Sequence, residues 1–304
     1  MAAAARRAPP APRRRAPCRS RRPCVVASAQ AVSAPLTAER KAEVKQRLLV
    51  LGATTDRGSL LFTQQAYAPL DEYGAADVAE VRSLLGELVD SAEGAPVDPG
   101  LVSGEWELVL ATKQLFRSSP FFMAVQEAFG DARAFGQKSS ELFFRLHELQ
   151  VKSWGVSTIG KVAQKVDLER GVMESYFDTV IFALTVIPIV GWFKLLPTFG
   201  GRVLTKSDNV ALDPETGRVG LELQTTRVDP APGVPLIPLV SGLLMGRDYP
   251  VNFVWKLLPW NRGRAPTAAT YVKFVDEDFR VTADRDGEYF VYVRRPEGTF
   301  AGGR

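Results

Sequence analysis

The spacing of apolar residues predicts two helices in the first third of the chain. Residues 37–51 open with a threonine and an early acid, which is a typical helix start, and then place apolar residues on one face. Residues 75–92 repeat apolar positions at steps of three and four, the period of a single helix face. The stretch 94–100 contains two prolines and two glycines, so we expect a linker there.

From Gly104 the pattern changes to short segments in which apolar and polar residues alternate, which is typical of strands with one face in water. The segments with this pattern are 104–110, 142–154, 162–168, 172–177, 219–225, 279–283 and 289–294. Asp286-Gly287 between the last two segments is a strong signal for a hairpin turn. Because no strand–helix–strand rhythm appears, we expect a mainly β fold, an antiparallel sandwich or barrel.

Two longer runs carry no charge, residues 179–193 and residues 230–246. Both are shorter than the roughly 20 residues of a membrane-spanning helix. Each run is consistent with a lip that faces lipid and with buried strand and loop, and four prolines favour the buried interpretation for the second run. At the end of the first run, Trp192, Phe193 and Lys194 combine aromatic and basic side chains as at a membrane interface, so they are candidate membrane contacts.

The first 27 residues have the composition of a targeting leader. They hold eight arginines and no acid, and they lack the continuous apolar core of a secretory signal. Val25-Val26-Ala27 resembles a plastid processing site, so we expect a transit peptide over residues 1–27. Without the leader, 30 basic and 34 acidic side chains remain, and the net charge changes from +4 to −4. A chain with this balance is not expected to bind nucleic acid.

Residues able to carry enzyme chemistry are scarce. The chain has one histidine, His147, and two cysteines, Cys18 and Cys24, both in the leader, which argues against cysteine–histidine metal clusters and disulfide frameworks. The glycine-rich nucleotide loops, the zinc-protease motif and the serine-hydrolase elbow are missing from the sequence. We therefore expect no catalytic residue, no metal and no cofactor, and we place His147 on a surface strand.

One acidic group and one aromatic group are the remaining candidates for a site. Asp276, Glu277 and Asp278 form either a solvated loop or a carboxylate at a barrel mouth, held by Arg280 in a charge-assisted hydrogen bond. Six phenylalanines cluster within 24 residues, at positions 121, 122, 129, 135, 143 and 144. Most of them are expected in the core, yet an apolar barrel interior without catalytic polar groups is also how proteins hold hydrophobic ligands.

Five blocks of the sequence carry a family resemblance. Residues 53–58 end in a Thr-x-Arg-Gly turn, residues 104–112 contain a Gly-x-Trp strand, and residues 117–122 contain Ser-Pro-Phe-Phe. The most specific pair of blocks is 270–281 followed by 287–294, which matches a closing strand pair. In this order the blocks resemble the plastid lipid-associated protein family, also called fibrillins, and the likeness covers about residues 37–297.

Three departures from the family pattern bear on the ligand. Ala111 stands where the family usually has tyrosine, and Phe279 replaces a common leucine. The segment 178–207 is longer and more apolar than in many members. The family subgroup, and with it the ligand, therefore stays open.

The resemblance implies a lipocalin-like antiparallel β-barrel over residues 101–297. A helical region and linker over 28–100 would precede it, and a flexible tail over 298–304 would follow. It also implies a non-enzymatic chloroplast protein at plastoglobules or thylakoids, which binds an isoprenoid, carotenoid or acyl lipid or coats lipid. The stroma stays open as an alternative location. The family's suggested lipid-binding acid falls on Asp276 or Asp278.

Burial of apolar area would retain such a ligand. The residues expected to contact it are Trp106, Phe121 and Phe122 inside, with Tyr271, Asp276, Asp278 and Arg280 as a polar rim. For Trp106 plain core packing is the favoured interpretation, and for Phe121 and Phe122 it is the anchoring of a loop in the core, although a residue can also do both. Three alternatives also stay open: a scaffold for a plastid prenyl-lipid or pigment biosynthetic enzyme, an enzyme acting on a lipid, and a coat that inserts residues 179–193 into a lipid monolayer.

Overall fold

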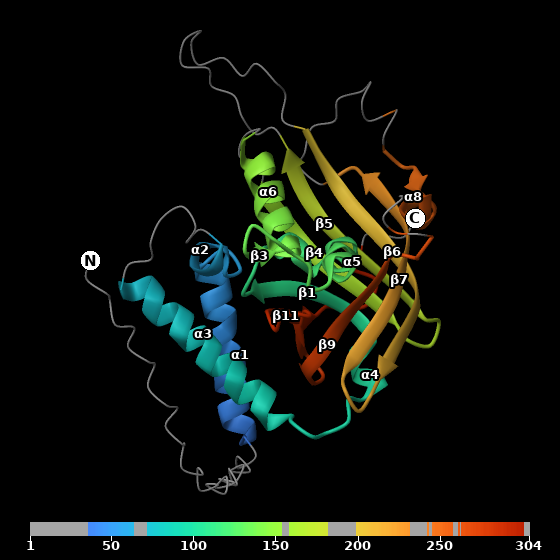
Figure 1. Ribbon diagram of the computed structural model, residues 1–304. Helices are drawn as coiled ribbons and strands as arrows, with labels where there is room; N and C mark the ends of the chain where they lie inside the picture. The colour runs from blue at the N-terminus through green and yellow to red at the C-terminus, as the bar shows by residue number, and fades with distance from the viewer. Residues whose placement is uncertain are drawn as a thin grey trace, which may run out of the picture. The chain divides into compact units, whose positions relative to one another are not determined.

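The structure of the protein is a computed structural model, shown in Figure 1, and it describes residues 36–63, 72–153, 158–181, 199–231, 242, 245–257, 261 and 263–300. The chain divides into two compact units, Met1–Ser33 and Ala34–Arg304. The first unit, with the expected transit peptide, lies outside the described residues. The helices and strands below all belong to the second unit.

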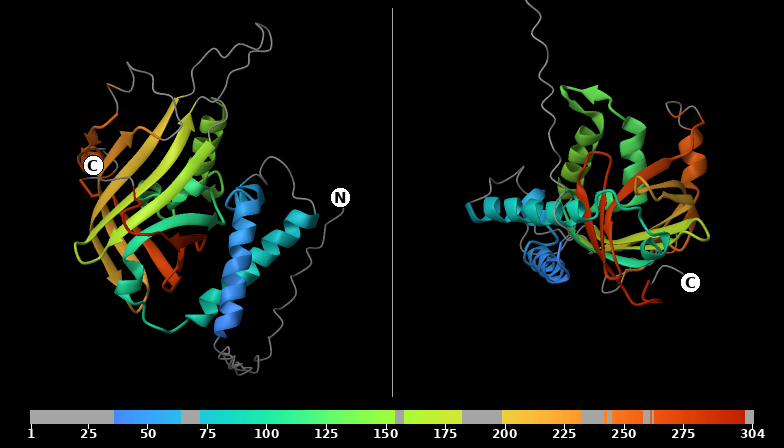
Figure 2. Two further views of the ribbon diagram at one scale, coloured as in Figure 1. Left: turned by 180° about the vertical axis from the view of Figure 1, so that it is seen from behind. Right: turned by 90° about the horizontal axis from the view of Figure 1, so that it is seen from below.

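Eight antiparallel strands close into a barrel, which Figure 2 shows from two further sides. Around the ring they follow the order β6 (Phe199–Asp213), β5 (Val172–Ile181), β4 (Thr158–Asp167), β1 (Gly104–Ala111), β11 (Tyr289–Arg294), β10 (Phe279–Ala283), β9 (Thr267–Val275) and β7 (Arg218–Asp229). Pairing of β7 with β6 closes the ring, and the short strand β8 (Asp248–Tyr249) is added beside β7. The mainly β, lipocalin-like barrel is therefore confirmed, and the alternative of a sandwich is wrong.

The pleat of each strand divides its side chains between the barrel interior and the outer face. On β11, Phe290 and Tyr292 point inward, whereas Val291 points outward. On β1, Trp106 and Leu108 point inward and contribute to the same inner cluster of apolar side chains. Strand β10 differs from the other seven because it contributes no apolar side chain to this inner cluster.

Helices α1 (Ala38–Thr54) and α3 (Glu72–Ser91) confirm the two predicted helices and cover the outer face of β9 to β11. The Thr37 hydroxyl caps α1 by accepting a backbone hydrogen bond, as its sequence predicts. Leu48 and Leu85 are fully buried, and each contributes about 2 kcal/mol through burial of its side chain. The outward strand residues beneath the helices are Phe274, Phe279, Val281 and Val291. Strand β10 is consequently buried on both faces.

A turn after α1 fixes the end of this helix on β1. Asp56, Arg57 and Gly58 all have positive φ, and Gly58 opens the short helix α2 (Ser59–Phe62). The Arg57 carbonyl accepts a hydrogen bond of 3.0 Å from the backbone N–H of Ala111. A Cβ atom on Gly58 would lie 2.4 Å from the Ala111 carbonyl oxygen, so only glycine fits this approach.

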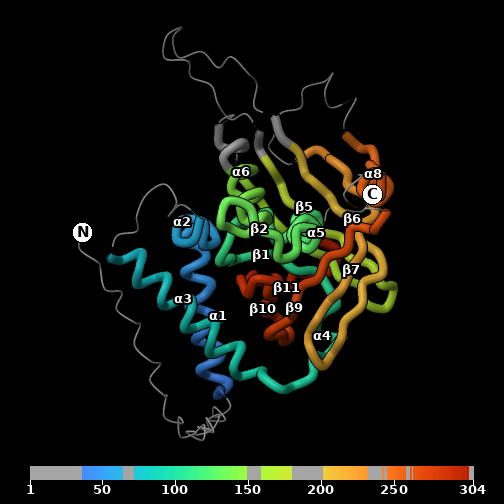
Figure 3. The backbone as a smooth tube through the Cα atoms, viewed as in Figure 1, coloured from blue at the N-terminus to red at the C-terminus, as the bar shows by residue number. Residues whose placement is uncertain are grey.

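Between β1 and β4 the chain crosses the barrel in helical segments, which Figure 3 shows in front of the strands. Segment η2 (Leu115–Ser118) contacts β4, and α5 (Pro120–Phe129) contacts β6, β7 and β9. Met123 of α5 belongs to the inner apolar cluster of the barrel. A hairpin of β2 (Arg133–Ala134) and β3 (Gln137–Lys138) follows. These segments cover part of the barrel interior.

The strand predicted over residues 142–154 is wrong, because most of this stretch lies in helix α6 (Ser139–Ser153). Phe143 and His147 are four residues apart on one helix face, and their rings stack with an interplanar angle of 5°. Phe144 contacts the rings of η2 and α5 from the same helix. His147 is therefore a helix residue in an aromatic cluster and does not lie on a surface strand.

The flexible tail expected over residues 298–304 is wrong for its first three residues. The carboxylate of Glu105, buried on β1, accepts hydrogen bonds from Gly298 N at 3.1 Å, Thr299 Oγ1 at 3.2 Å and Phe300 N at 2.8 Å. The Phe300 ring lies 4.8 Å from that of Tyr176. The end of the described chain is thus bound to the barrel.

The two uncharged runs fall largely outside the described residues. Residues 182–198, with the candidate membrane contacts Trp192, Phe193 and Lys194, belong to the part not described, as do residues 232–241. Across the described ranges, none of the helices combines the length and apolarity needed to span a membrane.

Candidate ligand-binding site in the barrel

Trp106 lies inside the barrel on β1, as its position in the alternating pattern predicts. Its side chain is fully buried, and its Nε1 donates a hydrogen bond of 3.0 Å to the Val102 carbonyl. Two guanidinium groups stack on the indole: the central carbon of Arg280 is 4.7 Å from the ring centre and that of Arg294 is 4.3 Å away. Trp106 therefore carries cation–π contacts as well as core packing.

Arg280 points into the barrel, so its expected place on a polar rim is wrong. Side chains along β10 alternate between the two faces of the sheet. Phe279 and Val281, on either side of Arg280 in the sequence, lie on the outer face under the helices. The guanidinium lies 4.6 Å from the centre of the Tyr292 ring and donates from Nη2 to Gln164 Oε1 at 2.7 Å. Desolvation by complete burial lowers the pKa of Arg280 to about 10, so the side chain is still a cation at neutral pH.

A short polar chain continues from Arg280 across the interior. Gln164 Nε2 donates to the Tyr292 hydroxyl at 3.1 Å and to the Ser118 carbonyl at 3.0 Å. Burial raises the pKa of Tyr292 to about 12, so its hydroxyl is neutral at physiological pH. This series of hydrogen bonds links the strands β4, β10 and β11 to η2 and gives the Arg280 guanidinium a neutral acceptor.

Gln164 and Tyr292 were not predicted as site residues. A signal for Gln164 exists, because it shares the alternation of Val162 and Val166 and so occupies an inward position with a polar side chain. Tyr292 lies on an inward position of β11 and resembles an ordinary core aromatic residue until its contact with Arg280 is known.

Asp276 and Asp278 lie outside the barrel and do not bind Arg280, which corrects the expected charge-assisted bond. Lys45 of α1 reaches both carboxylates, with Nζ 2.6 Å from Asp276 Oδ2 and 2.6 Å from Asp278 Oδ1. Asp276 Oδ1 also accepts the backbone N–H of Phe279 at 3.0 Å and so shapes the turn between β9 and β10. These acids hold α1 to the barrel.

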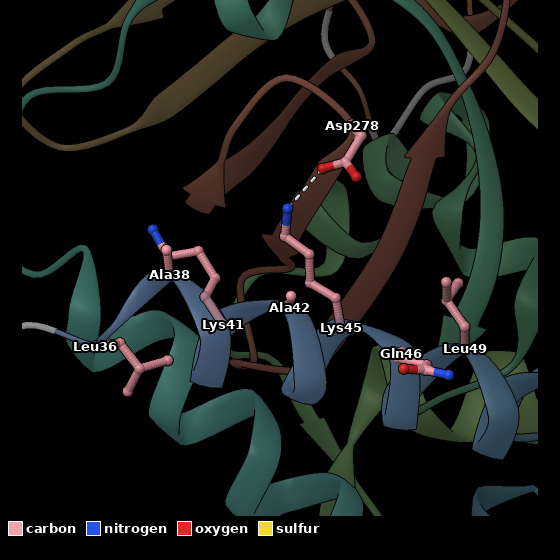
Figure 4. A pocket seen from close by; sticks show the side chains of 8 residues that line it. All are labelled: Leu36, Ala38, Lys41, Ala42, Lys45, Gln46, Leu49 and Asp278. Atoms are coloured by element: carbon pink, nitrogen blue, oxygen red, sulfur yellow. Dashed lines mark hydrogen bonds and ion pairs between the residues drawn. The ribbon is translucent and has the colours of Figure 1, made fainter.

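Figure 4 shows Lys45 extending from α1 to Asp278 within a surface groove of about 450 Å³. Burial alone would lower the pKa of Lys45, but hydrogen bonds to Asp276 and Asp278 raise it overall. The same hydrogen bond from Lys45 lowers the pKa of Asp278. Tyr271 is also on the outer side, where Lys273 Nζ lies 5.7 Å from its ring centre. The expected polar rim is therefore not assembled at one place.

Phe121 and Phe122 lie on α5 and belong to an aromatic cluster beside the barrel. The Phe122 ring is 4.7 Å from that of Phe116 and 5.2 Å from that of Phe121. His147 contacts this cluster, and burial lowers the pKa of its imidazole. Phe121 also packs against the inner cluster of the barrel. Phe121 is thus next to the barrel interior, whereas Phe122 packs within the aromatic cluster.

A buried ionic network fastens η2 and α5 to the turn between β10 and β11. Arg117, buried on η2, donates to Glu141 Oε1 at 2.7 Å and to Asp284 Oδ2 at 3.0 Å. Gln126 of α5 donates to Asp286 Oδ2 at 2.7 Å. Burial raises the pKa of Asp284, against the opposing effect of the Arg117 charge. Arg117 is therefore a buried cation that has carboxylate partners.

Comparison of the chain with protein-family models, with curated proteins and with solved structures returned no match.

Proposed function

We propose that this chain is a non-enzymatic plastid lipid-associated protein whose barrel binds a small hydrophobic molecule. The ligand would be an isoprenoid, carotenoid or acyl lipid, and the protein would act at the plastoglobule or thylakoid surface of the chloroplast. This proposal combines the sequence resemblance to fibrillins with the barrel fold.

The observation that carries the proposal is the inner apolar cluster of a closed eight-strand barrel. A barrel of this strand number has an interior that either its own side chains fill or one small ligand occupies. Side chains such as Leu108, Leu223 and Phe290 offer that ligand apolar contacts, and transfer of its surface from water gives about 25 cal/mol per Å².

The test is lipid retention by the full chain. The purified protein is incubated with a plastid lipid extract and purified again, and bound lipid is identified by mass spectrometry. The variant Ala268→Trp adds an indole on an inward position of β9, and Val50→Trp adds one on the exposed side of α1. We expect about one lipid per chain for the wild type and for Val50→Trp. Loss of lipid in Ala268→Trp, with a wild-type circular dichroism spectrum, supports the proposal.

Two results would contradict it: no retained lipid in the wild type, or undiminished retention in a folded Ala268→Trp variant. The first result would favour a barrel filled by its own side chains.

The second candidate function is a scaffold for a plastid prenyl-lipid or pigment biosynthetic enzyme. The observation in its favour is helix α8 (Val251–Leu257), where Phe253, Val254 and Leu257 are 63 %, 53 % and 65 % exposed. Contiguous exposed apolar side chains are typical of interaction surfaces. Under this alternative, Phe253→Ser with Leu257→Ser abolishes co-purification of such an enzyme and leaves lipid retention unchanged.

A further inference from the structure

Buried arginines in the described part of the chain differ in their partners. Arg117 binds carboxylates, and Arg202 binds both oxygens of Asp178 at 2.7 Å and 3.1 Å. Arg294, which is partly buried beside Trp106, donates to backbone carbonyls, including that of Ser103 at 2.8 Å. Arg280 has neither kind of partner among the described residues: it forms no ion pair with a carboxylate, and the acceptor of its hydrogen bond is a side-chain amide.

The N–H donors of Arg280 have few hydrogen-bond acceptors for a buried cation. Among the described residues its hydrogen-bond partner is the neutral amide oxygen of Gln164, and its Nε–H is buried with no acceptor. Its contacts with Trp106 and Tyr292 stabilise the charge without neutralising it. A buried charge that lacks a counterion is costly, and buried charges in proteins are normally paired.

The surroundings of Arg280 show what kind of counterion would fit. The guanidinium lies on the inner side of β10 beside the rings of Trp106 and Tyr292, whereas other inner residues of the barrel include Leu108, Val272 and Phe290. A ligand that reaches Arg280 therefore meets this guanidinium, with Arg294 on the same indole, at one end and mainly apolar side chains elsewhere. This is the pattern of an amphiphile with a single small anionic head and an apolar body.

We propose that Arg280 binds the carboxylate head group of an acyl ligand whose chain lies against the inner apolar cluster. The inference rests on the proposed function and narrows its ligand class. A neutral carotenoid or isoprenoid would leave the buried charge of Arg280 unpaired.

The binding test compares oleate with oleyl alcohol, which has the same chain and a neutral head. Both are titrated into the delipidated full chain, the variant Arg280→Met and the control Arg285→Met, which removes a half-exposed surface charge held by Glu127 and Asp131. We expect the wild type and Arg285→Met to prefer oleate by about tenfold or more, the usual range for a hydrogen bond to a charged group. In Arg280→Met the preference disappears, and the dissociation constant of the alcohol is unchanged.

A second measurement separates a ligand-binding role from a structural one. Without lipid, Arg280→Met removes an unpaired buried charge, so we expect its Tm at or above that of the wild type. Arg117→Met removes an equally buried but paired charge, and its Tm should fall by several degrees. A drop of several degrees in Arg280→Met would mark Arg280 as a structural residue and overturn the inference.

The binding outcomes distinguish the inference from the proposed function beneath it. If the wild type binds both lipids equally, or if Arg280→Met keeps the preference for oleate, the head-group inference fails and lipid binding stands. If the wild type binds neither lipid, the head-group inference fails, and the proposed function fails with it only when the protein also retains no lipid from the plastid extract.

Discussion

Trp106 of β1 and Arg280 of β10 meet inside the barrel, with the guanidinium carbon 4.7 Å from the centre of the indole ring, although strand β11 lies between their two strands. Tyr292 of β11 contacts the same guanidinium at 4.6 Å. The three side chains lie against one another on the inner face. They also concentrate charge and aromatic surface where the remaining strands present aliphatic side chains.

The first prediction concerns Trp106. Trp106→Ala removes a fully buried indole and its hydrogen bond to Val102, and we expect a loss of about 3–5 kcal/mol in the free energy of unfolding. Urea denaturation measures it, with Leu49→Ala on the exposed side of α1 as the control. A loss below about 1 kcal/mol for Trp106→Ala would show that Trp106 is not part of the packed interior.

The second prediction compares two glycines. Gly58→Ala combines φ of +84° with a Cβ atom 2.4 Å from the Ala111 carbonyl, so we expect destabilisation of about 1–3 kcal/mol. Gly86 lies within α3, and nothing is within 4 Å of its Cβ position. Gly86→Ala should therefore stabilise the protein by about 0.5–1 kcal/mol. Thermal unfolding of both variants checks the contrast, and equal effects would contradict the docking of the turn on β1.

The third prediction is that Asp278 contributes to stability and not to lipid binding. Asp278→Asn breaks the ion pair with Lys45 on the outer surface, so lipid retention should stay within twofold of the wild type while stability falls slightly. Because the pKa of Asp278 is lowered in the folded state, its contribution is present at neutral pH and disappears as the pH falls through that lowered value, below about 4.

Thermal unfolding from pH 7 to pH 3 measures this dependence. The Tm difference between the wild type and Asp278→Asn should shrink toward zero at the acid end. Loss of lipid retention in Asp278→Asn at neutral pH would instead support the lipid-binding role that the resemblance to fibrillins implies for this acid.

The fourth prediction concerns the end of the chain. Glu105 binds three donors from residues 298–300, so Glu105→Ala should release them and cost about 1–3 kcal/mol through the loss of hydrogen bonds to a charged group. Hydrogen exchange of the Phe300 amide should become faster in this variant. Unchanged protection of that amide would show that Phe300 is held by its contact with Tyr176 alone.

Much of the fold could be predicted from the sequence because local patterns and tertiary packing agree there. The strands around Trp106 and the hairpin at Asp286-Gly287 are such cases. Helix α6 was missed because charged residues stand between its aromatic residues, so the sequence looks like the alternating pattern of a strand. The aromatic residues share one face only when the segment is helical. Strand β6 was missed because polar residues such as Thr205 and Ser207 are buried along it.

The candidate site was harder to predict for a physical reason. A sequence shows that Asp276, Asp278 and Arg280 are close along the chain, and their spacing of two would place all three on one face of a continuous strand. In the structure the two acids belong to the turn between β9 and β10 and pair with Lys45, which comes from a helix far away in the sequence, whereas Arg280 lies on β10 and points inward. The partner of a charged residue depends on tertiary structure and cannot be predicted from the residue pattern of a single strand.

The most direct test of the account locates a bound lipid on the protein. The full chain is loaded with a fatty acid that carries a photoactivatable diazirine on its acyl chain, irradiated and digested, and the labelled residues are identified by mass spectrometry. The account predicts labels on inward residues such as Leu108, Leu223 and Phe290. Labels confined to the groove beside Lys45 or to the exposed face of α8 would contradict binding in the barrel.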